Sequence, residues 1–420
     1  MSFQQGLSGL NATSKNLEVI GNNIANANTF GSKTSRAEFS DMYAAALNGG
    51  GASTIGIGTN LAAVAQQFTQ GNITTTENPM DLAINGAGFF QITDGKSPVT
   101  YTRNGQFKLD RDGYIVNSAQ QRLMGYAADD TGVIQPGQAV AMQLPTAGIA
   151  PQQTTGVTVE LNLDARLGNT APTPAGINFS NANTYNNATS LTVYDAKGQE
   201  VAVTLYFQKD ASAANPDRWN IFATANGTSV TGTPATPLTT LDFQPDGSAP
   251  VGAVSAISLP IPASTNAAGA ATMAIGATID LSGATQFGAA FGVTDMRQDG
   301  FSAGLLTGIS VEPNGIITAR YSNGQTRPAG QIEVANFRNP QGLAPMGNNA
   351  WSRSFASGDP VAGVPGDGNL GVLQAGALEE SNIDLTGELV SMITAQRIYQ
   401  ANAQTIKTQD QVLQTLVNLR

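Results

Sequence analysis

The chain contains few of the residue types that usually carry enzyme chemistry. Among its 420 residues there is no His and no Cys. Without imidazole it lacks the commonest general base near neutral pH and the commonest metal ligand, and without thiols it lacks thiolate nucleophiles and thiolate metal sites. Carboxylates, hydroxyls and Lys remain, but they form no recognisable catalytic set. We therefore predict that the protein is not an enzyme, with no catalytic, cofactor-binding or metal-binding residues and no cofactor.

Two short motifs resemble ligand sites, and both fit turns better. Gly86-Ala87-Gly88 is the first half of a dinucleotide fingerprint, but Gln91 stands where the last Gly should be and no helical pattern follows. Asp110 and Asp112 resemble the start of a calcium loop, but Tyr114 stands at the fifth position and no Glu at the twelfth. We interpret the first motif as a glycine turn between strands and the second as a hairpin over 107–116.

The charge and hydropathy of the chain exclude several classes of partner. Only 12% of the residues are charged, the net charge is −10 and the pI is near 4.5, which disfavours binding to nucleic acid or anionic membranes. No apolar run approaches the ~18 residues of a membrane span. No apolar stretch typical of a secretory signal follows the first basic residue, Lys15. We predict no nucleic-acid partner, no membrane insertion and, if the protein is exported, a route that leaves its N-terminus intact.

Both ends of the chain carry apolar residues at coiled-coil spacing, in alternating steps of four and three. A helix over 385–419 would be roughly 50 Å long at about 1.5 Å per residue, and it needs a partner to cover its apolar side. We predict helices over 1–28 and 385–419 whose seams serve self-assembly. The predicted assembly seam consists of Phe3, Leu7, Leu10, Leu17, Ile24, Leu385, Leu389, Met392, Tyr399, Ile406, Leu413 and Val417.

An apolar stripe at helical spacing is often only a core face within a monomer. Here no other helix-rich region is available to cover two such helices, so they are left with each other and with neighbouring copies. The residues beside the seams are mostly uncharged Asn and Gln, so copies of the pair could pack side by side without like-charge repulsion. We therefore favour contacts with copies of the same chain, while pairing within or between subunits stays open.

The middle of the chain has the pattern of short strands separated by turns. Pairs of Asn-Gly or Asp-Gly, which favour hairpin turns, recur at 104–105, 112–113, 246–247, 314–315 and 323–324. Composition shifts near 144–151 and 283–292 bracket a second β segment. Trp219 and Trp351 are predicted to be buried anchors of the two β regions.

We therefore predict a mixed, mainly β fold, in which long terminal α-helices form a coiled-coil-like pair around two nested antiparallel β domains. Nesting follows if the two chain ends must meet. A stretch at 61–68 could be helix or strand, and 32–71 has no predicted structure. The predicted organisation is a discontinuous terminal helical assembly domain (1–30 and 378–420), connecting segments (31–71 and 364–377), a split inner β domain (72–147 and 284–363) and an inserted outer β domain (148–283).

Several segments resemble the bacterial flagellar rod and hook family of axial proteins. The sequence NNIANANTFGSK at 22–33 is similar to the N-terminal signature of this family, and 389–402 is similar to its C-terminal signature. The segments at 85–90 and 101–107 resemble β-domain motifs of the rod and hook group. The inserted segment, with TYNNATSLTVYD at 184–195, is similar to the outer domain of hook subunits and narrows the resemblance to them.

The resemblance implies a structural role. It implies a subunit that assembles with copies of itself into a hollow, bendable helical tube, the hook, which acts as a universal joint between the basal-body rod and the filament. It also implies export without a cleaved signal peptide to the bacterial flagellum on the cell exterior. Partners implied in this way are the distal rod, the hook cap, the hook–filament junction proteins and the flagellar export apparatus.

Two alternatives remain at this point. A distal rod or other axial flagellar subunit would have similar ends, but the inserted domain disfavours it because rod subunits are far shorter. A secreted β-rich adhesin or enzyme belongs to a different class, and for it the sequence offers neither a catalytic set nor a ligand motif.

Overall fold

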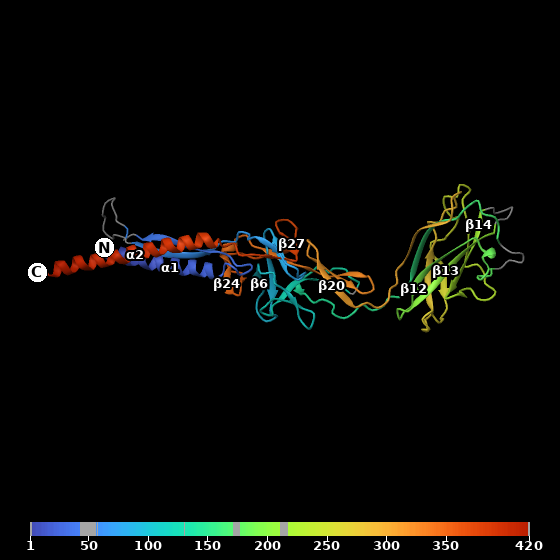
Figure 1. Ribbon diagram of the computed structural model, residues 1–420, viewed down its shortest axis with the longest axis horizontal. Coiled ribbons are helices and arrows are strands. Elements are labelled where there is room, and N and C mark those ends of the chain that lie inside the picture. Colours follow the sequence, from blue (N-terminus) through green and yellow to red (C-terminus); the bar gives the residue numbers. More distant parts are fainter. Residues whose placement is uncertain are drawn as a thin grey trace. The chain divides into compact units, whose positions relative to one another are not determined.

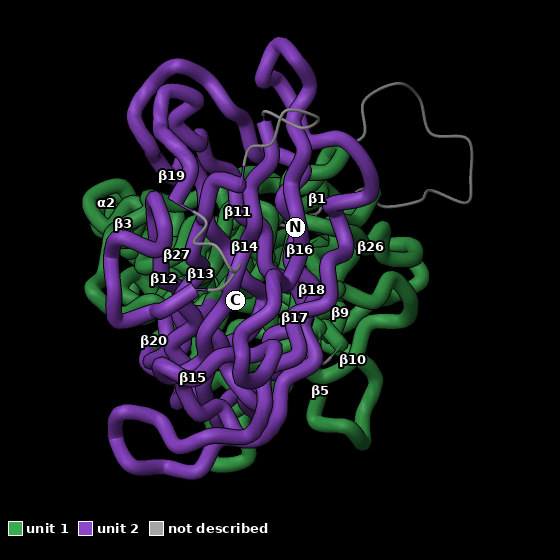
Figure 2. The backbone as a smooth tube through the Cα atoms, turned by 90° about the vertical axis from the view of Figure 1, so that its right-hand side faces the viewer, with its two compact units in different colours: residues 1–146, 308–320, 326–420 green, residues 147–307, 321–325 purple. Residues whose placement is uncertain are grey.

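The computed structural model describes residues 2–42, 56, 58–129, 131–170, 177–210 and 217–418. Contacts between residues divide the chain into two compact units, coloured separately in Figure 2. Unit 1 comprises 1–146, 308–320 and 326–420, and unit 2 comprises 147–307 and 321–325. The mainly β fold with a helix at each end is confirmed, and both ends of the chain belong to unit 1.

The two helices are α1 (Ser2–Ala25) and α2 (Leu385–Asn418). They lie side by side, as Figure 1 shows in blue and red, and they contact each other. Gly6 near the start of α1 lies against Ile406, whereas Asn23 near its end bonds to Glu388, so the helices are antiparallel. Because Gly6 lies against Ile406 and α2 continues to Asn418, the last residues of α2 extend past the start of α1.

A β-hairpin follows α1 where the sequence left a connecting segment without predicted structure. Strands β1 (Ser35–Met42) and β2 (Gly58–Gln66) pair antiparallel from Ser35↔Gln66 to Met42↔Gly58, with a bulge at Glu38/Phe39. Both strands contact α1. Neither strand has a buried residue. A strand without a buried face needs no alternation of apolar and polar residues, so the sequence of this segment does not clearly predict a strand.

The β region of unit 1 is built on a 13-stranded sheet in the order β20-β21-β22-β9-β5-β6-β25-β24, with five further strands joined to this path. A short 3₁₀ helix, Pro340–Gly342, precedes β24. The strands are β5 (Phe89–Thr93), β6 (Thr100–Thr102), β7 (Lys108–Leu109), β8 (Ile115–Val116), β9 (Arg122–Ala127), β10 (Val140–Ala141), β20 (Leu306–Val311), β21 (Ile316–Tyr321), β22 (Thr326–Ile332), β23 (Val334–Asn336), β24 (Ala344–Gly347), β25 (Ala350–Ser352) and β26 (Val361–Gly363).

An aromatic cluster forms part of the core of unit 1. The rings of Phe68, Phe89 and Trp351 meet edge to face with centroids 5.3–5.8 Å apart, the geometry that aromatic quadrupoles favour. Tyr101 and Phe337 extend the cluster. Trp351 is buried as the sequence predicted, and its indole N–H donates to Gln66 of β2.

Two small ladders join the C-terminal segment to the N-terminal half of unit 1. Strand β27 (Val372–Ala375) pairs with β4 (Leu82–Asn85), and β28 (Ala377–Glu379) pairs with β3 (Ile73–Thr75). The segment predicted to be a connector at 364–377 therefore contains one complete strand and the start of another. These pairings fix the chain immediately before α2.

The prediction of a hairpin turn at Asn104-Gly105 is wrong, whereas the prediction of a hairpin over 107–116 is confirmed. The hairpin over 107–116 forms, since β7 pairs with β8, and Gly113 takes a positive φ of 85°. Gly105 has no positive φ; a Cβ there would lie within van der Waals overlap of the Leu82 carbonyl, which belongs to a distant segment. The backbone N–H of Leu82 donates to the Gly105 carbonyl. Gly is therefore needed at 105 for close backbone approach rather than for a turn.

Unit 2 contains two sheets around one core, in which Trp219 is fully buried as predicted. A short 3₁₀ helix spans Ala182–Thr184. The four-stranded sheet has the order β17 (Ile257–Ile261), β18 (Ile275–Asp280), β11 (Gly156–Asn162) and β19 (Gly292–Gln298). The five-stranded sheet contains β12 (Asn187–Tyr194), β13 (Glu200–Lys209), β14 (Arg218–Ala225), β15 (Thr228–Ser229) and β16 (Thr239–Asp242).

Two features of unit 2 differ from the sequence predictions. Strands β11 and β18 pair in parallel, so the β regions are not wholly antiparallel; these strands are far apart in sequence, and no hairpin sets their relative direction. Strand β19 pairs with β11 in the same sheet. It therefore belongs with the inserted segment, although the sequence-based boundary at 283 separates the two.

Candidate assembly surface

Small residues of α1 line its contact with α2. A Cβ added to Gly6 would lie 3.1 Å from Cγ1 of Ile406, and one added to Gly9 would lie 2.9 Å from Nδ2 of Asn402. Thr13 of α1 and Ala395 of α2 are buried. The helices approach closely because these positions of α1 have no side chain, which is how small residues act at tight helix crossings.

The predicted assembly seam is only partly at this contact. Leu10, Leu17, Ile24, Met392 and Ile406 are half-buried. The other described members are exposed, with fractions from 37% for Tyr399 to 50% for Leu413; they are Phe3, Leu7, Leu385, Leu389, Tyr399 and Leu413. The side chain of Val417 lies outside the described residues. The seam's role in contacts between copies stays a prediction.

The first half of α2 carries an exposed apolar ridge formed by Leu385, Leu389, Val390 and Ile393. Their exposed fractions are 44%, 45%, 60% and 52%. Leu385, Leu389 and Ile393 recur every four residues, so they lie along one side of the helix, and Val390 lies next to them. Buried Ala395 marks a different side, which faces α1. The ridge is therefore apolar surface that α1 does not cover.

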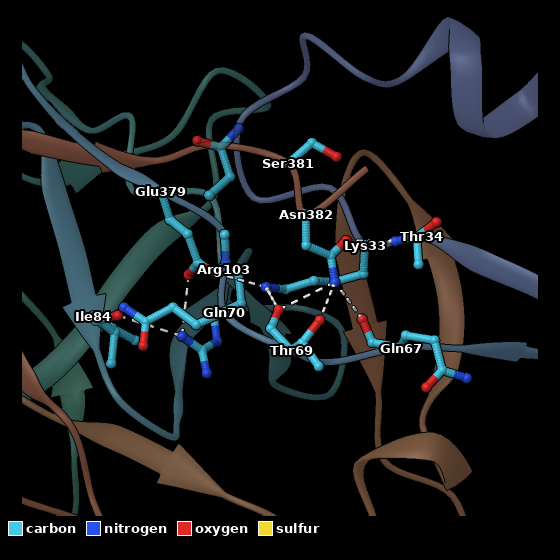
Figure 3. Close-up of polar contacts among 12 residues, drawn as sticks. Lys33, Thr34, Gln67, Thr69, Gln70, Ile84, Arg103, Glu379, Ser381 and Asn382 are labelled. Atoms are coloured by element: carbon cyan, nitrogen blue, oxygen red, sulfur yellow. Dashed lines mark hydrogen bonds and ion pairs between the residues drawn. The ribbon is translucent and has the colours of Figure 1, made fainter. Parts of the chain in front are cut away.

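A buried polar network lies where α1 ends and α2 begins. We call it the chain-end network; its members are Asn23, Lys33, Arg103, Glu379 and Asn382. Figure 3 shows four of them around the segment at 67–70. The Glu379 carboxylate accepts hydrogen bonds from Lys33 Nζ at 2.6 Å and from Arg103 Nη1 at 3.1 Å. The side chains of Lys33 and Glu379 are fully buried, and that of Arg103 is 4% exposed.

Backbone groups complete the surroundings of this ion cluster. The N–H of Gly71 donates to the Glu379 carboxylate, and Lys33 Nζ donates to the Thr69 carbonyl at 2.8 Å. Arg103 donates to the carbonyls of Ile84 and Gly86. The Glu379 carboxylate, which lies just before α2, therefore connects the segment after α1 with the β region of unit 1.

Two Asn side chains extend the network toward the helices. The Asn382 amide accepts from the N–H of Thr34 and donates to the carbonyls of Gln67 and Thr69, as Figure 3 shows. The Asn23 amide accepts from the N–H of Ser35, donates to the Ser35 carbonyl at 2.8 Å and donates to the Glu388 carboxylate at 2.9 Å. Asn23 is 2% exposed, so its amide is committed to these bonds.

The electrostatics of the ion cluster are unbalanced, because two cations share one carboxylate. Burial lowers the pKa of Lys33, and the charge and hydrogen bond of Glu379 oppose that shift. Burial lowers the pKa of Arg103 in the same way, again opposed by Glu379. Buried ion pairs recover little net stability beyond their desolvation cost, but removal of one partner is strongly destabilising. The cluster is therefore better suited to fixing geometry than to adding stability.

No local sequence pattern predicts the chain-end network. Lys33 and Arg103 lie within the segments at 22–33 and 101–107 that carry the family resemblance, but their pairing with Glu379 spans hundreds of residues. The available signal was the low charge of the chain: in Ala377-Leu378-Glu379, a carboxylate ends an apolar strand in a protein with only 12% charged residues. Such a Glu is a candidate for a buried ion pair.

The described residues offer neither a metal cluster nor a membrane-spanning helix. Among the described residues, no group of three or more Asp and Glu side chains could hold a metal ion. Neither α1 nor α2, as far as each is described, is long and apolar enough to cross a membrane.

Comparison with known families connects both ends of the chain to flagellar proteins. Residues 3–33 match the family described as flagella basal body rod protein, and 374–419 match the flagellar basal body rod FlgEFG protein C-terminal family. Between them, 83–162 match the flagellar hook protein FlgE/F/G D1 domain and 162–301 match the flagellar basal body protein FlaE D2 domain. Lys33 and Glu379 thus lie in the two terminal matches.

Whole-chain comparison is more specific. The chain is 40% identical over 424 residues to the flagellar hook protein FlgE of Salmonella typhimurium, and 40% identical over 425 residues to that of Escherichia coli. Each alignment covers 100% of both chains. The chain belongs to the flagellar hook protein family.

More distant hook proteins agree. The hook protein of Borreliella burgdorferi is 32% identical over 455 residues, covering 100% of this chain and 99% of its own. A crystal structure of the Helicobacter pylori flagellar hook protein FlgE2 matches the fold with a TM-score of 0.54 at 14% identity, covering 73% of this chain and 99% of that one. Membership of the hook family places the protein in the bacterial flagellum.

Proposed function

We propose that the chain is the structural subunit of a flagellar hook: a hollow, bendable tube of self-assembled copies that joins the basal-body rod to the filament as a universal joint. The observation that carries the proposal is the 40% identity to hook proteins over the full length of both chains. The role is structural and needs no catalytic chemistry.

In this proposal the helical pair is the main assembly element. The apolar ridge on α2 is exposed. If polymerisation buries it, association is stabilised by about 25 cal/mol for each Å² of apolar surface removed from water. Few charges lie on either helix, which limits repulsion between parallel copies. The terminal helices would form the inner wall of the tube, the β region of unit 1 the middle wall and the inserted unit the outer surface.

The domain organisation is proposed with one revision. The terminal helical domain, the split inner β domain and the inserted outer domain are retained as predicted, but the inserted domain is extended beyond 283 to include β19, because that strand pairs with β11. The proposal also includes the β1–β2 hairpin with the helical pair, since both of its strands contact α1.

Partners and route of export follow from the same proposal. Copies of the chain are the principal partner. The distal rod, the hook cap, the hook–filament junction proteins and the flagellar export apparatus would be the others, with the hook on the cell exterior. A fixed tube between rod and filament requires contacts at both of its ends.

Electron microscopy of concentrated purified protein tests the proposal. We expect tubes that can curve. Introducing charge into the ridge with Leu389→Glu and Ile393→Glu should abolish them, because buried carboxylates would lack partners. Thr405→Glu, at an exposed polar position of the same helix that lies off the ridge, is the control and should leave tubes intact. If the ridge variant still forms tubes, the ridge is not needed for assembly. If the parent protein forms no tubes, the protein is not a hook subunit of the proposed kind.

Another axial flagellar subunit is the second candidate, since the matches at both chain ends carry the names of rod proteins. The same images discriminate between the two. Short, straight tubes support a rod subunit, and curved tubes support a hook. A secreted adhesin or enzyme would give no tubes, and the described part of the chain offers no site in support of it.

A further inference from the structure

The contact between α1 and α2 does not by itself select one register strongly. Small or uncharged residues repeat along both helices: Gly6 and Thr13 lie seven residues apart on α1, as do Ala395 and Asn402 on α2. A slip of one heptad would place Gly9 against Ala395 or Gln409 in place of Asn402. The contacts of Gly6 with Ile406 and of Gly9 with Asn402 involve no charged side chain. A slip would move Ile406 beside Thr13 or past the start of α1, which only the bulk of one side chain opposes, so further contacts must specify the register.

The chain-end network contacts both chain ends beside this helix pair. Asn23 joins the end of α1 to Glu388 in the first turn of α2. Asn382 joins the segment after α1 to the segment before α2 through Thr34. Glu379 does the same through Lys33. A slip of seven residues moves one helix by roughly 10 Å along the other at about 1.5 Å per residue, which would break all three connections.

We propose that the chain-end network is a register lock: Asn23, Lys33, Arg103, Glu379 and Asn382 are positioning residues that fix the axial register of α1 against α2 within one chain. Buried polar groups are known to specify helix register at some cost in stability. The buried, directional bonds of the network supply the selectivity that the small-residue contact lacks. The lock itself does not depend on the proposed function; its consequence for assembly does, because the ridge is correctly placed only in one register.

Cysteine cross-linking measures the register directly, because the chain has no Cys of its own. Gly9→Cys with Asn402→Cys reports the observed register, since a Cβ at Gly9 lies 3.2 Å from Cγ of Asn402. Gly9→Cys with Ala395→Cys, and Gly9→Cys with Gln409→Cys, report slips of one heptad in either direction. Dilute full-length protein in a glutathione redox buffer keeps the disulfides intramolecular and the exchange reversible.

In the parent background we expect the observed-register pair to form at least about tenfold more disulfide than either slipped pair, a preference of about 1.4 kcal/mol. The unlocked variant combines Asn23→Ala, Lys33→Met, Arg103→Met, Glu379→Leu and Asn382→Ala. It removes the whole network without leaving a buried charge unpaired. In it, the preference should fall to within about threefold.

Two further variants keep the test decisive. If the five-residue variant fails to fold, Asn23→Ala with Asn382→Ala leaves the ion cluster intact and should give an intermediate preference. Leu123→Ala, a core substitution in unit 1 outside the network, lowers stability and should leave the preference unchanged. If the network only added stability, its removal would leave the register preference unchanged, as Leu123→Ala should.

The proposal is overturned if the unlocked variant keeps the tenfold preference, or if the parent protein shows none. Polymer formation is imaged separately on the same proteins. If the unlocked variant loses the register preference but the parent protein forms no tubes, the register lock is supported and the proposed function is rejected. If the parent protein forms tubes but shows no register preference, the proposed function is supported and the register lock is rejected.

Discussion

At the scale of single residues, Glu333 is a buried carboxylate that lies outside the chain-end network. It is 6% exposed, accepts from Gln91 at 2.7 Å and accepts from the Tyr126 hydroxyl at 2.8 Å. Burial raises the pKa of Glu333 above its ordinary value of 4.5, and the two hydrogen bonds oppose that shift. Burial and the contact with Glu333 together raise the pKa of Tyr126 to about 12.

The raised pKa of Glu333 has a defined consequence for stability. A carboxyl that binds its proton more tightly in the folded state favours folding below its unfolded pKa, and this contribution is lost as pH rises through the folded pKa. Glu333→Gln removes the titration. We therefore expect the variant to gain stability relative to the parent between about pH 4 and pH 8.

Urea unfolding midpoints of unit 1, measured for the parent and for Glu333→Gln at about pH 4 and about pH 8, give this difference. If the new Gln side chain fits poorly against Gln91 and Tyr126, it lowers stability equally at both pH values. Only the change of the stability difference with pH therefore reports the titration of Glu333. Tyr126→Phe is the control of opposite sign, since it removes a hydrogen bond that lowers the pKa of Glu333 and should steepen the pH dependence. A variant whose stability difference is the same at both pH values would show that Glu333 does not titrate in this window.

Residue types were the most reliable part of the sequence prediction, and residue partners the least. Trp219 and Trp351 were predicted to be buried and are, because a large ring in a strand pattern has one favourable environment. Glu379 could not be assigned in the same way. Its three charge and hydrogen-bond partners lie near residues 33, 71 and 103, and no local pattern relates such distant positions.

At the scale of elements, the glycines of α1 have different surroundings. A Cβ added at Gly9 would lie 2.9 Å from Nδ2 of Asn402, whereas a Cβ added at Gly21 would meet nothing within 4 Å. Gly21→Ala should therefore stabilise α1 by about 1 kcal/mol through helix propensity alone. Gly9→Val should destabilise the helix pair by about 1–3 kcal/mol, because the close approach is lost.

Thermal unfolding followed by far-ultraviolet circular dichroism compares these two variants, and electron microscopy reports their polymers. Gly9→Val combined with Asn402→Ala should recover part of the loss, since the opposing amide is removed. Equal effects of Gly9→Val and Gly21→Ala would mean that the two helices do not pack closely at Gly9.

The elements themselves were predicted well where one period dominates. Both helices were predicted within a few residues of their ends, because apolar residues at steps of three and four extend over most of their length. The close contact between the helices within one chain had no hydropathy signal, because it lies at Gly6 and Gly9. Leu7 and Leu389 of the predicted assembly seam are exposed, and their role between copies stays a prediction.

At the scale of the whole molecule, the two chain ends form one unit with the split β region. A deletion of 379–420 would remove Glu379 and leave Lys33 and Arg103 buried without their carboxylate. A deletion of 385–420 removes α2 alone and keeps the ion cluster. A shorter deletion of 410–420 removes only the end of α2, and it should leave the helix pair intact because Gly6 faces Ile406.

We expect both the 385–420 and the 410–420 deletions to abolish tubes while the β regions remain folded. Circular dichroism and limited proteolysis check the fold, and electron microscopy checks assembly. The shorter deletion is the stricter experiment, since its monomer keeps the contact between α1 and α2. Tubes formed by it would show that the end of α2 is dispensable for polymerisation.

The nested organisation could be predicted because both terminal seams needed partners and the β patterns changed composition between them. The structure divides the chain into a split unit and an inserted unit, but with β19 in the inserted one. That strand could not be assigned from sequence. Its residues read equally well as the start of the following hairpin region, and only pairing with β11, more than a hundred residues earlier, decides the question.

The unequal lengths of the two helices have a further consequence. The end of α2, with Val412 and Leu413 about half exposed, has no counterpart on α1. If each incoming subunit covers that end on its predecessor, it presents an identical uncovered end of its own. Each added subunit therefore provides the binding surface for the next one, and head-to-tail addition of this kind gives an open polymer and not a closed ring. The length of the tube would then be set not by the subunit but by whatever stops its supply or occupies its last exposed end.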